Sequence, residues 1–184
     1  MPSPIAHAVT GYCLGQFWRR FPAQPALPSG KTMLGIAVWS AIAADIDFIP
    51  QLLSDLSLHR GITHSLGVGI LSSVIVSGIF ARQSRKQFLT VMILALVSYG
   101  SHLFLDLLTA GGSGIPVFWP ITNATIQLPW ALFPQVHHSE GLFYRGHVLF
   151  LFFETAYAAL ILLITHWSIR FHRKADIRKA SKSL

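Results

Sequence analysis

Charged side chains are scarce in this chain of 184 residues, and acidic side chains are the scarcest. Asp, Glu, Lys and Arg together make up 11% of the sequence, with 7 acidic and 14 basic residues. A typical soluble domain is about 25% charged. The deficit argues against an ordinary water-facing surface. It fits lipid, because a charge at the bilayer centre costs about 2.5–3.5 kcal/mol on insertion scales.

Cysteine is nearly absent as well. Cys13 is the single cysteine of the chain, which excludes an internal disulfide and any zinc motif built from several cysteines. A metal site in this protein would therefore have to use histidine and carboxylate ligands.

Long apolar segments dominate what is present. Four of them have the length of about 20 residues that crosses a bilayer, and a fifth, Ile5–Trp18, is shorter. The four long segments are Met33–Leu53, Ile62–Ala81, Phe88–Leu108 and Val148–Ile169. The pattern predicts an all-α, polytopic membrane helical bundle with four long transmembrane helices and a short N-terminal membrane helix. We expect one domain, residues 1–184, with a basic tail at 170–184.

The basic residues predict the orientation of these segments. If the segments alternate in direction, 12 of the 14 basic residues lie on one side, and only Arg60 and Arg145 lie on the other. The positive-inside rule then places the C-terminus in the cytoplasm. The net charge of +7 is thus mainly a topology signal. We therefore expect the lipid bilayer, and no nucleic acid, as the partner of this chain.

The same alternation brings polar residues from four segments to one level near the outward face. These residues are His7, Asp45, Asp47, His59, His64, His102 and Asp106. Ionisable residues inside membrane segments are functional candidates by default. His102 and Asp106 are four residues apart, so both side chains lie on one helix face and can bind one metal ion.

The two neighbouring acids leave an alternative open. In an intact helix Asp45 and Asp47 would point about 200° apart. Pro50 disfavours helix at Ile49, and a loosened helix would let both carboxylates approach one site. Otherwise one of them ligates and the other forms hydrogen bonds.

The segment from His59 to Ser65 lies where a loop enters a helix. His64 is its better ligand candidate, while His59 is a candidate for ligation, proton donation or holding the loop. Arg60 would stabilise charge on a phosphate, or would simply extend to the membrane interface. The sequence leaves open the roles of His137, His138, His147 and Glu154.

Together these motifs resemble the YdjM-like family of inner-membrane proteins, which are regarded as metal-dependent hydrolases. The resemblance covers about residues 5–125. It is carried by His7 followed by Gly11, Ala44-Asp45-Ile46-Asp47, His59-Arg60-Gly61-Ile62-Thr63-His64-Ser65, His102-x3-Asp106 and Gly114–Pro120. The family usually has proline where Ala44 stands. The resemblance implies a multi-pass protein of the cell inner membrane.

That family is in turn similar to zinc-dependent phospholipase C and nuclease P1, which are helical multi-zinc phosphoesterases. The resemblance implies metal ligation by His7, Asp45 or Asp47, His64, His102 and Asp106. The later His-x3-Glu pair of those enzymes is missing, so we expect one or two divalent ions, with zinc as the expected metal.

The expected function is hydrolysis of a lipid or lipid-linked phosphoester at the outward membrane face, with catalytic roles for Asp47, His59 and Arg60. The alternatives are a cation- or proton-handling membrane protein and a helix bundle with a structural metal site.

Overall fold

The computed structural model describes residues 2–19, 27–49, 60–135 and 145–180, and over these residues the protein is all-helical. The α-helices are α1 (Pro4–Trp18), α2 (Gly30–Ile42), α4 (Leu66–Phe80), α5 (Arg85–Leu107) and α6 (Arg145–Ala180). Two short 3-10 helices, η1 (Ala43–Asp47) and η2 (Ile62–His64), follow α2 and precede α4. The all-α prediction is confirmed.

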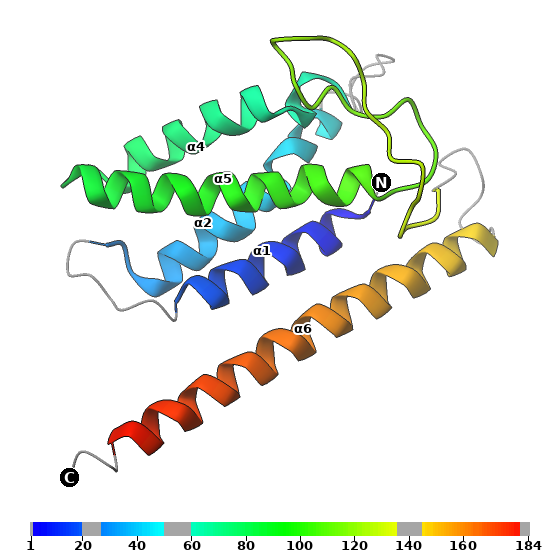
Figure 1. Cartoon of the computed structure of the whole chain (residues 1–184). Helices are drawn as coiled ribbons and strands as arrows, with labels where there is room; N and C mark the ends of the chain where they lie inside the picture. Colours follow the sequence, from blue (N-terminus) through cyan, green and yellow to red (C-terminus); the bar gives the residue numbers. More distant parts are fainter. Residues whose placement is uncertain (1, 20–26, 50–59, 136–144, 181–184) are drawn as a thin grey trace.

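The helices form a bundle with two different ends (Figure 1). Helix α5 is central and packs against α1, α2 and α4, while α6 lies along α1. Helices α1 and α6 end, and α5 begins, at the end where Arg19, Arg85 and Arg170 lie. The 3-10 helices η1 and η2 and the last turn of α5 meet at the opposite end. The bundle thus places Arg19, Arg85 and Arg170 at one end and Asp45, Asp47, His64 and Asp106 at the other.

Small residues let the helices approach closely. A Cβ atom on Gly11 would lie 2.7 Å from the carbonyl oxygen of Ala37 and 2.7 Å from Cβ of Ala41. Gly15, one turn further along α1, faces Leu34 and Ala37 in the same way. This Gly-x3-Gly pattern is typical of helix pairs in membranes, where small residues allow backbone contact.

The prediction of four long transmembrane helices is wrong. Only two helices of the described chain are long and apolar enough to cross a membrane, Arg85–Leu107 with 23 residues and Gly146–His172 with 27. Helices α1 and α4 have 15 residues each and α2 has 13. At 1.5 Å per residue, 15 residues span about 22 Å, less than the ~30 Å hydrocarbon core.

The shortening has a local cause. The apolar composition assigned residues 43–47 to one span and residues 62–64 to the next. In the structure these residues form η1 and η2 instead, and they carry Asp45, Asp47 and His64. Both predicted spans therefore lose α-helix at the bundle end, where 3-10 helices that carry the polar side chains take its place.

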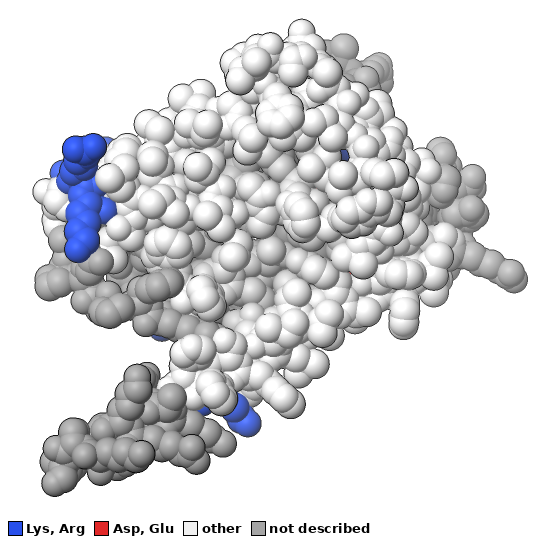
Figure 2. Space-filling view, in the orientation of Figure 1, with Lys and Arg blue, Asp and Glu red and all other residues white. Residues whose placement is uncertain are grey.

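The outer surface of the bundle is strongly apolar. Large aliphatic and aromatic side chains are exposed along α4 and α6, among them Leu71, Ile75, Phe152 and Leu163. On the face drawn in Figure 2, Lys and Arg gather at the basic end and most of the remaining surface is uncharged. Monomeric soluble proteins rarely expose contiguous apolar surface on this scale. Lipid tails are the surroundings that such a surface fits.

Candidate metal centre

Six of the predicted site residues meet at one end of the bundle. His7 comes from α1, Asp45 and Asp47 from η1, His64 from η2, and His102 and Asp106 from α5. The imidazoles of His7, His64 and His102 and the carboxylate of Asp106 are fully buried. Asp45 keeps 10% of its side chain exposed. Four separate segments therefore contribute to one buried polar cluster, in which Asp45 and Asp47 are the partly exposed members.

Four donor atoms of this cluster lie at similar distances from one another. Nε2 of His64 is 3.3 Å from Oδ2 of Asp106 and 3.6 Å from Oδ1 of Asp45. Nε2 of His102 is 3.4 Å and 3.6 Å from the same two oxygens. Two ligand atoms about 2.05 Å from a tetrahedral zinc ion lie about 3.3 Å apart. These four distances are therefore close to the separation expected between ligands of one ion, and His64, His102 and Asp106 form a set in which every donor lies near the other two.

The orientation of His102 is set by a main-chain oxygen. Its Nδ1 lies 2.8 Å from the carbonyl oxygen of Ala41, the residue next to the end of α2. Because a carbonyl oxygen only accepts, Nδ1 carries the proton and Nε2 presents its lone pair to the cluster. Metal-binding histidines are usually fixed by such a hydrogen bond on their other nitrogen.

His64 is held in the same way by a carboxylate. Oδ2 of Asp47 lies 3.3 Å from Nδ1 of His64, and the hydroxyl of Thr63 donates to the same oxygen. Asp47 is thus on the far side of the ring from Nε2. Of the two alternatives that the sequence left open, the geometry favours the one in which Asp45 faces the donor set and Asp47 supports a ligand.

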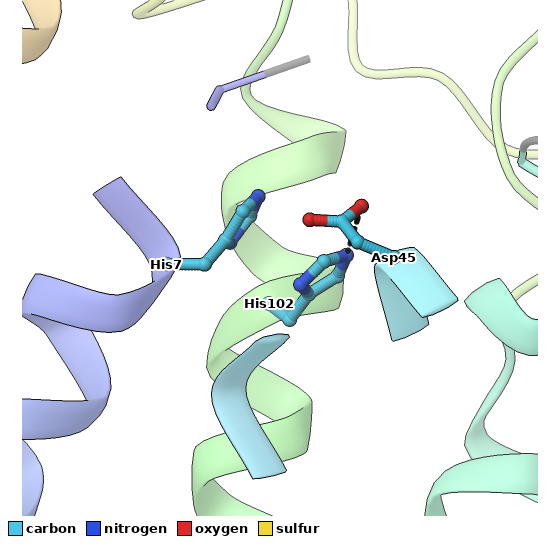
Figure 3. A group of neighbouring side chains, drawn as sticks. All are labelled: His7, Asp45 and His102. Atoms are coloured by element: carbon cyan, nitrogen blue, oxygen red, sulfur yellow. Dashed lines mark ion pairs between the residues drawn. The ribbon is translucent and has the colours of Figure 1, made fainter. Parts of the chain in front are cut away.

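His7 extends the cluster on one side. Its ring stacks on that of His102 with centroids 3.8 Å apart, beside the carboxylate of Asp45 (Figure 3). Nε2 of His7 is 3.5 Å from Oδ1 of Asp106, the oxygen that does not face His64 and His102. His7, Asp45 and His102 form one group able to hold a metal ion, and His64, His102 and Asp106 form another. Asp106 thus offers a different oxygen to each side.

Several buried polar atoms of the cluster have no hydrogen-bond partner within the described part of the chain. Among the described residues, no partner of normal hydrogen-bond geometry satisfies either carboxylate oxygen of Asp45 or Asp106, or Nε2 of His102. Three ionised aspartates bring three negative charges to the cluster. Buried charges are normally paired or bind metal ions. The donor set therefore fits one or two divalent cations in number, charge and distance.

The acids also act on the basicity of His64, which precedes α4. Burial alone would lower the pKa of this imidazole. Asp45 and Asp47 beside the ring, together with the charge of Asp106, outweigh burial and raise the pKa of His64 to about 9. The cluster therefore attracts positive charge at this position, which a proton or a metal ion can supply.

Sequence comparison places the chain in a known family. The family model described as YdjM inner membrane protein matches residues 1–174. The chain belongs to the YdjM inner membrane protein family. It is 28% identical over 134 residues to Inner membrane protein YbcI of Escherichia coli (strain K12). The aligned region covers 71% of this chain and 74% of YbcI. No solved structure matches the chain significantly.

Arg60 of this YdjM-family chain precedes η2 in the sequence and contacts the loop that follows α5. Its Nη1 donates to the carbonyl oxygen of Gly111 at 3.0 Å, and its backbone has a positive φ of 67°. A Cβ on Gly112 would lie 2.1 Å from the same Nη1, and the φ of 81° at Gly112 favours glycine beneath the guanidinium. Arg60 therefore connects η2 to the long loop after α5.

The remaining candidates fall into two groups. His59, His137 and His138 lie outside the described residues. His147 is half-buried near the start of α6, and Glu154 is buried on α6 and accepts a hydrogen bond from the backbone N–H of Ser3. Glu154 thus links α6 to the start of α1, one turn before His7.

Three supporting groups were not predicted from the sequence of this family member. They are the Thr63 hydroxyl, the Ala41 carbonyl oxygen and Tyr99, whose hydroxyl donates to the carbonyl oxygen of Thr63. Tyr99 lies three residues before His102 on the inner face of α5, and that spacing is a usable signal. A main-chain carbonyl carries no signal in the residue types.

Proposed function

We propose that this inner membrane protein is a metal-dependent hydrolase of a lipid or lipid-linked phosphoester. The observation that supports this most is the buried set of three donors from His64, His102 and Asp106, with the partly exposed Asp45 beside it. A structural metal site fills every position with protein ligands, whereas a catalytic site leaves one for water or substrate.

His64, His102 and Asp106 would hold the ion, Asp45 would lie beside its remaining position, and zinc suits this mixture of imidazole and carboxylate ligands. A zinc ion supplies Lewis-acid chemistry, making water nucleophilic near neutral pH and polarising a phosphoryl oxygen. His7 would add a ligand for a second ion beside Oδ1 of Asp106. Asp47 and Thr63 would keep the His64 ring in its binding orientation.

Apolar residues around the open side favour an amphiphilic substrate. Ile46 and Phe48 flank the aspartates of η1, and Ile62 lies two residues before His64; all three side chains are at least 40% exposed. A substrate with a hydrocarbon chain would contact these side chains while its phosphoester reached Asp45. Arg60 would then contribute a cation near the phosphate, in addition to holding Gly111.

The test measures metal and hydrolysis together. Protein purified in detergent is analysed for zinc and assayed against a panel of phospholipids and soluble phosphoesters. We expect about one or two zinc ions per chain, hydrolysis of a lipid phosphoester, and loss of both in His102→Ala. His172→Ala is the matched control, because Nδ1 of this exposed histidine has the same kind of contact, 2.8 Å from a main-chain oxygen.

Arg60→Ala separates the catalytic from the metal-binding role. We expect this variant to keep its zinc and lose turnover. Stoichiometric zinc without hydrolysis of any phosphoester in the panel would support a structural metal site instead. Absence of zinc in the unmodified protein would contradict the proposal.

A further inference from the structure

A second feature, which shares no residue with the metal centre, lies between α1 and α6. A groove with a volume of about 540 Å³ is lined by Tyr12 and Gln16 of α1 and by residues of α6 that include Leu162, His166 and Ile169. This volume is in the range of roughly 300–1,000 Å³ found for sites of small molecules. None of the six metal-centre residues lines it.

The groove has one polar edge. Nε2 of Gln16 donates to the hydroxyl of Tyr12 at 2.8 Å, and Nη1 of Arg19 donates to Oε1 of Gln16 at 3.4 Å. These three residues follow one side of α1 in the sequence order i, i+4 and i+7. His166 lies on the opposite wall, and the exposed Arg170 follows it by one turn of α6. The polar edge therefore leads to the basic end of the bundle.

Apart from Thr165, the rest of the groove is apolar. Ala159, Leu162, Leu163 and Ile169 form most of the α6 wall. A hydrogen bond at 2.9 Å between Thr10 and Tyr157 joins the two helices further towards the metal centre. The groove thus combines a hydrocarbon-lined length with a cationic mouth, within a helix pair of an inner membrane protein.

We propose that this groove binds one anionic phospholipid. The acyl chain would lie against Leu162 and Ala159, and the phosphate would meet Arg19, Gln16 and His166 at the mouth. Charge complementarity decides the headgroup, since Arg19 contacts Gln16 at the groove edge and Arg170 follows His166 by one turn of α6. Basic residues near a membrane surface favour anionic lipid by about 1 kcal/mol each, which corresponds to about a fivefold preference. This site is independent of the proposed hydrolase activity.

The test compares lipid retention by native mass spectrometry. The protein is purified from detergent containing equal amounts of phosphatidylglycerol and phosphatidylcholine with identical acyl chains. We expect one retained phosphatidylglycerol per chain. Arg19→Gln should lower the preference for it by about fivefold. Ala159→Phe should displace both lipids, because the added ring fills the groove.

Matched controls are available on the same bundle. Arg82→Gln removes an exposed cation outside the groove, and Leu160→Phe enlarges an exposed side chain that does not line it. Both controls should retain phosphatidylglycerol as the unmodified protein does. Equal retention of the two lipids, or an equal effect of Arg82→Gln and Arg19→Gln, would overturn the proposal.

Discussion

Asp47 and Asp106 differ in their relation to the metal-binding nitrogens, and replacing each with asparagine tests the assignment of ligands. Both substitutions preserve side-chain shape and remove one negative charge. Asp106 places Oδ2 3.3 Å and 3.4 Å from Nε2 of His64 and His102, so it belongs to the donor set. Asp47 contacts only the far nitrogen of His64 in these ion pairs, at 3.3 Å.

The expected magnitudes follow from these positions. Loss of the partner behind a metal-binding histidine typically lowers metal affinity about 10–100-fold, or about 1.4–2.7 kcal/mol. We expect this range for Asp47→Asn. Asp106→Asn removes a donor oxygen from the ion itself, so we expect its loss of affinity to exceed 100-fold.

The assay titrates metal-free protein in detergent with zinc against a chromophoric chelator of known affinity. Unfolding temperature at a fixed zinc concentration gives a second measurement, because stabilisation by a ligand falls as its dissociation constant rises. If Asp106→Asn binds zinc as tightly as the unmodified protein while Asp47→Asn does not, the two roles are reversed. If neither substitution alters zinc binding, the cluster is not the metal site.

Three further predictions concern packing and topology. Gly11→Ala should lower the free energy of unfolding by about 1–3 kcal/mol, and with it the unfolding temperature, because its methyl group would overlap the α2 backbone. Gly35→Ala should lower neither, because there is open space around Gly35. Glu154→Leu should destabilise the protein by about 1–3 kcal/mol in chemical denaturation, since the partly buried N–H of Ser3 loses its acceptor. A stability equal to that of the unmodified protein would show that this contact is dispensable. Reporter fusions should place the C-terminus in the cytoplasm and the loop Gly111–Pro134 outside; cytoplasmic signal from the loop would reverse the topology.

The sequence predicted the location of the cluster better than the lengths of the helices. Alternating segments and basic residues were enough to place His7, His64 and His102 at one end, because antiparallel helices bring distant residues to the same level. Helix α5 also agrees closely with its prediction, Arg85–Leu107 against Phe88–Leu108, since its polar residues lie on one buried face and do not interrupt the helix.

Helices α2 and α4 were predicted too long because composition does not distinguish an apolar helix from an apolar 3-10 turn. Ile42 and Ile46 are equally apolar, yet α2 ends between them. What ends the helix is the position of the acids relative to His64 and His102, which are distant in sequence. Because that constraint comes from tertiary structure, the hydropathy of the sequence does not predict it.

The same tertiary constraint explains the spacing of the two acids. Two residues apart in a 3-10 helix, side chains are rotated by about 240° around the axis, which leaves their directions about 120° apart. Asp45 and Asp47 therefore cannot point in one direction. An imidazole has nitrogens on two sides of its ring, and η2 places the His64 ring between the two carboxylates. Asp45 lies 3.6 Å from Nε2 and Asp47 lies 3.3 Å from Nδ1. The Asp-x-Asp motif therefore supplies one oxygen to the donor set and one support for its neighbouring ligand, which is why a single-residue spacer suits this site.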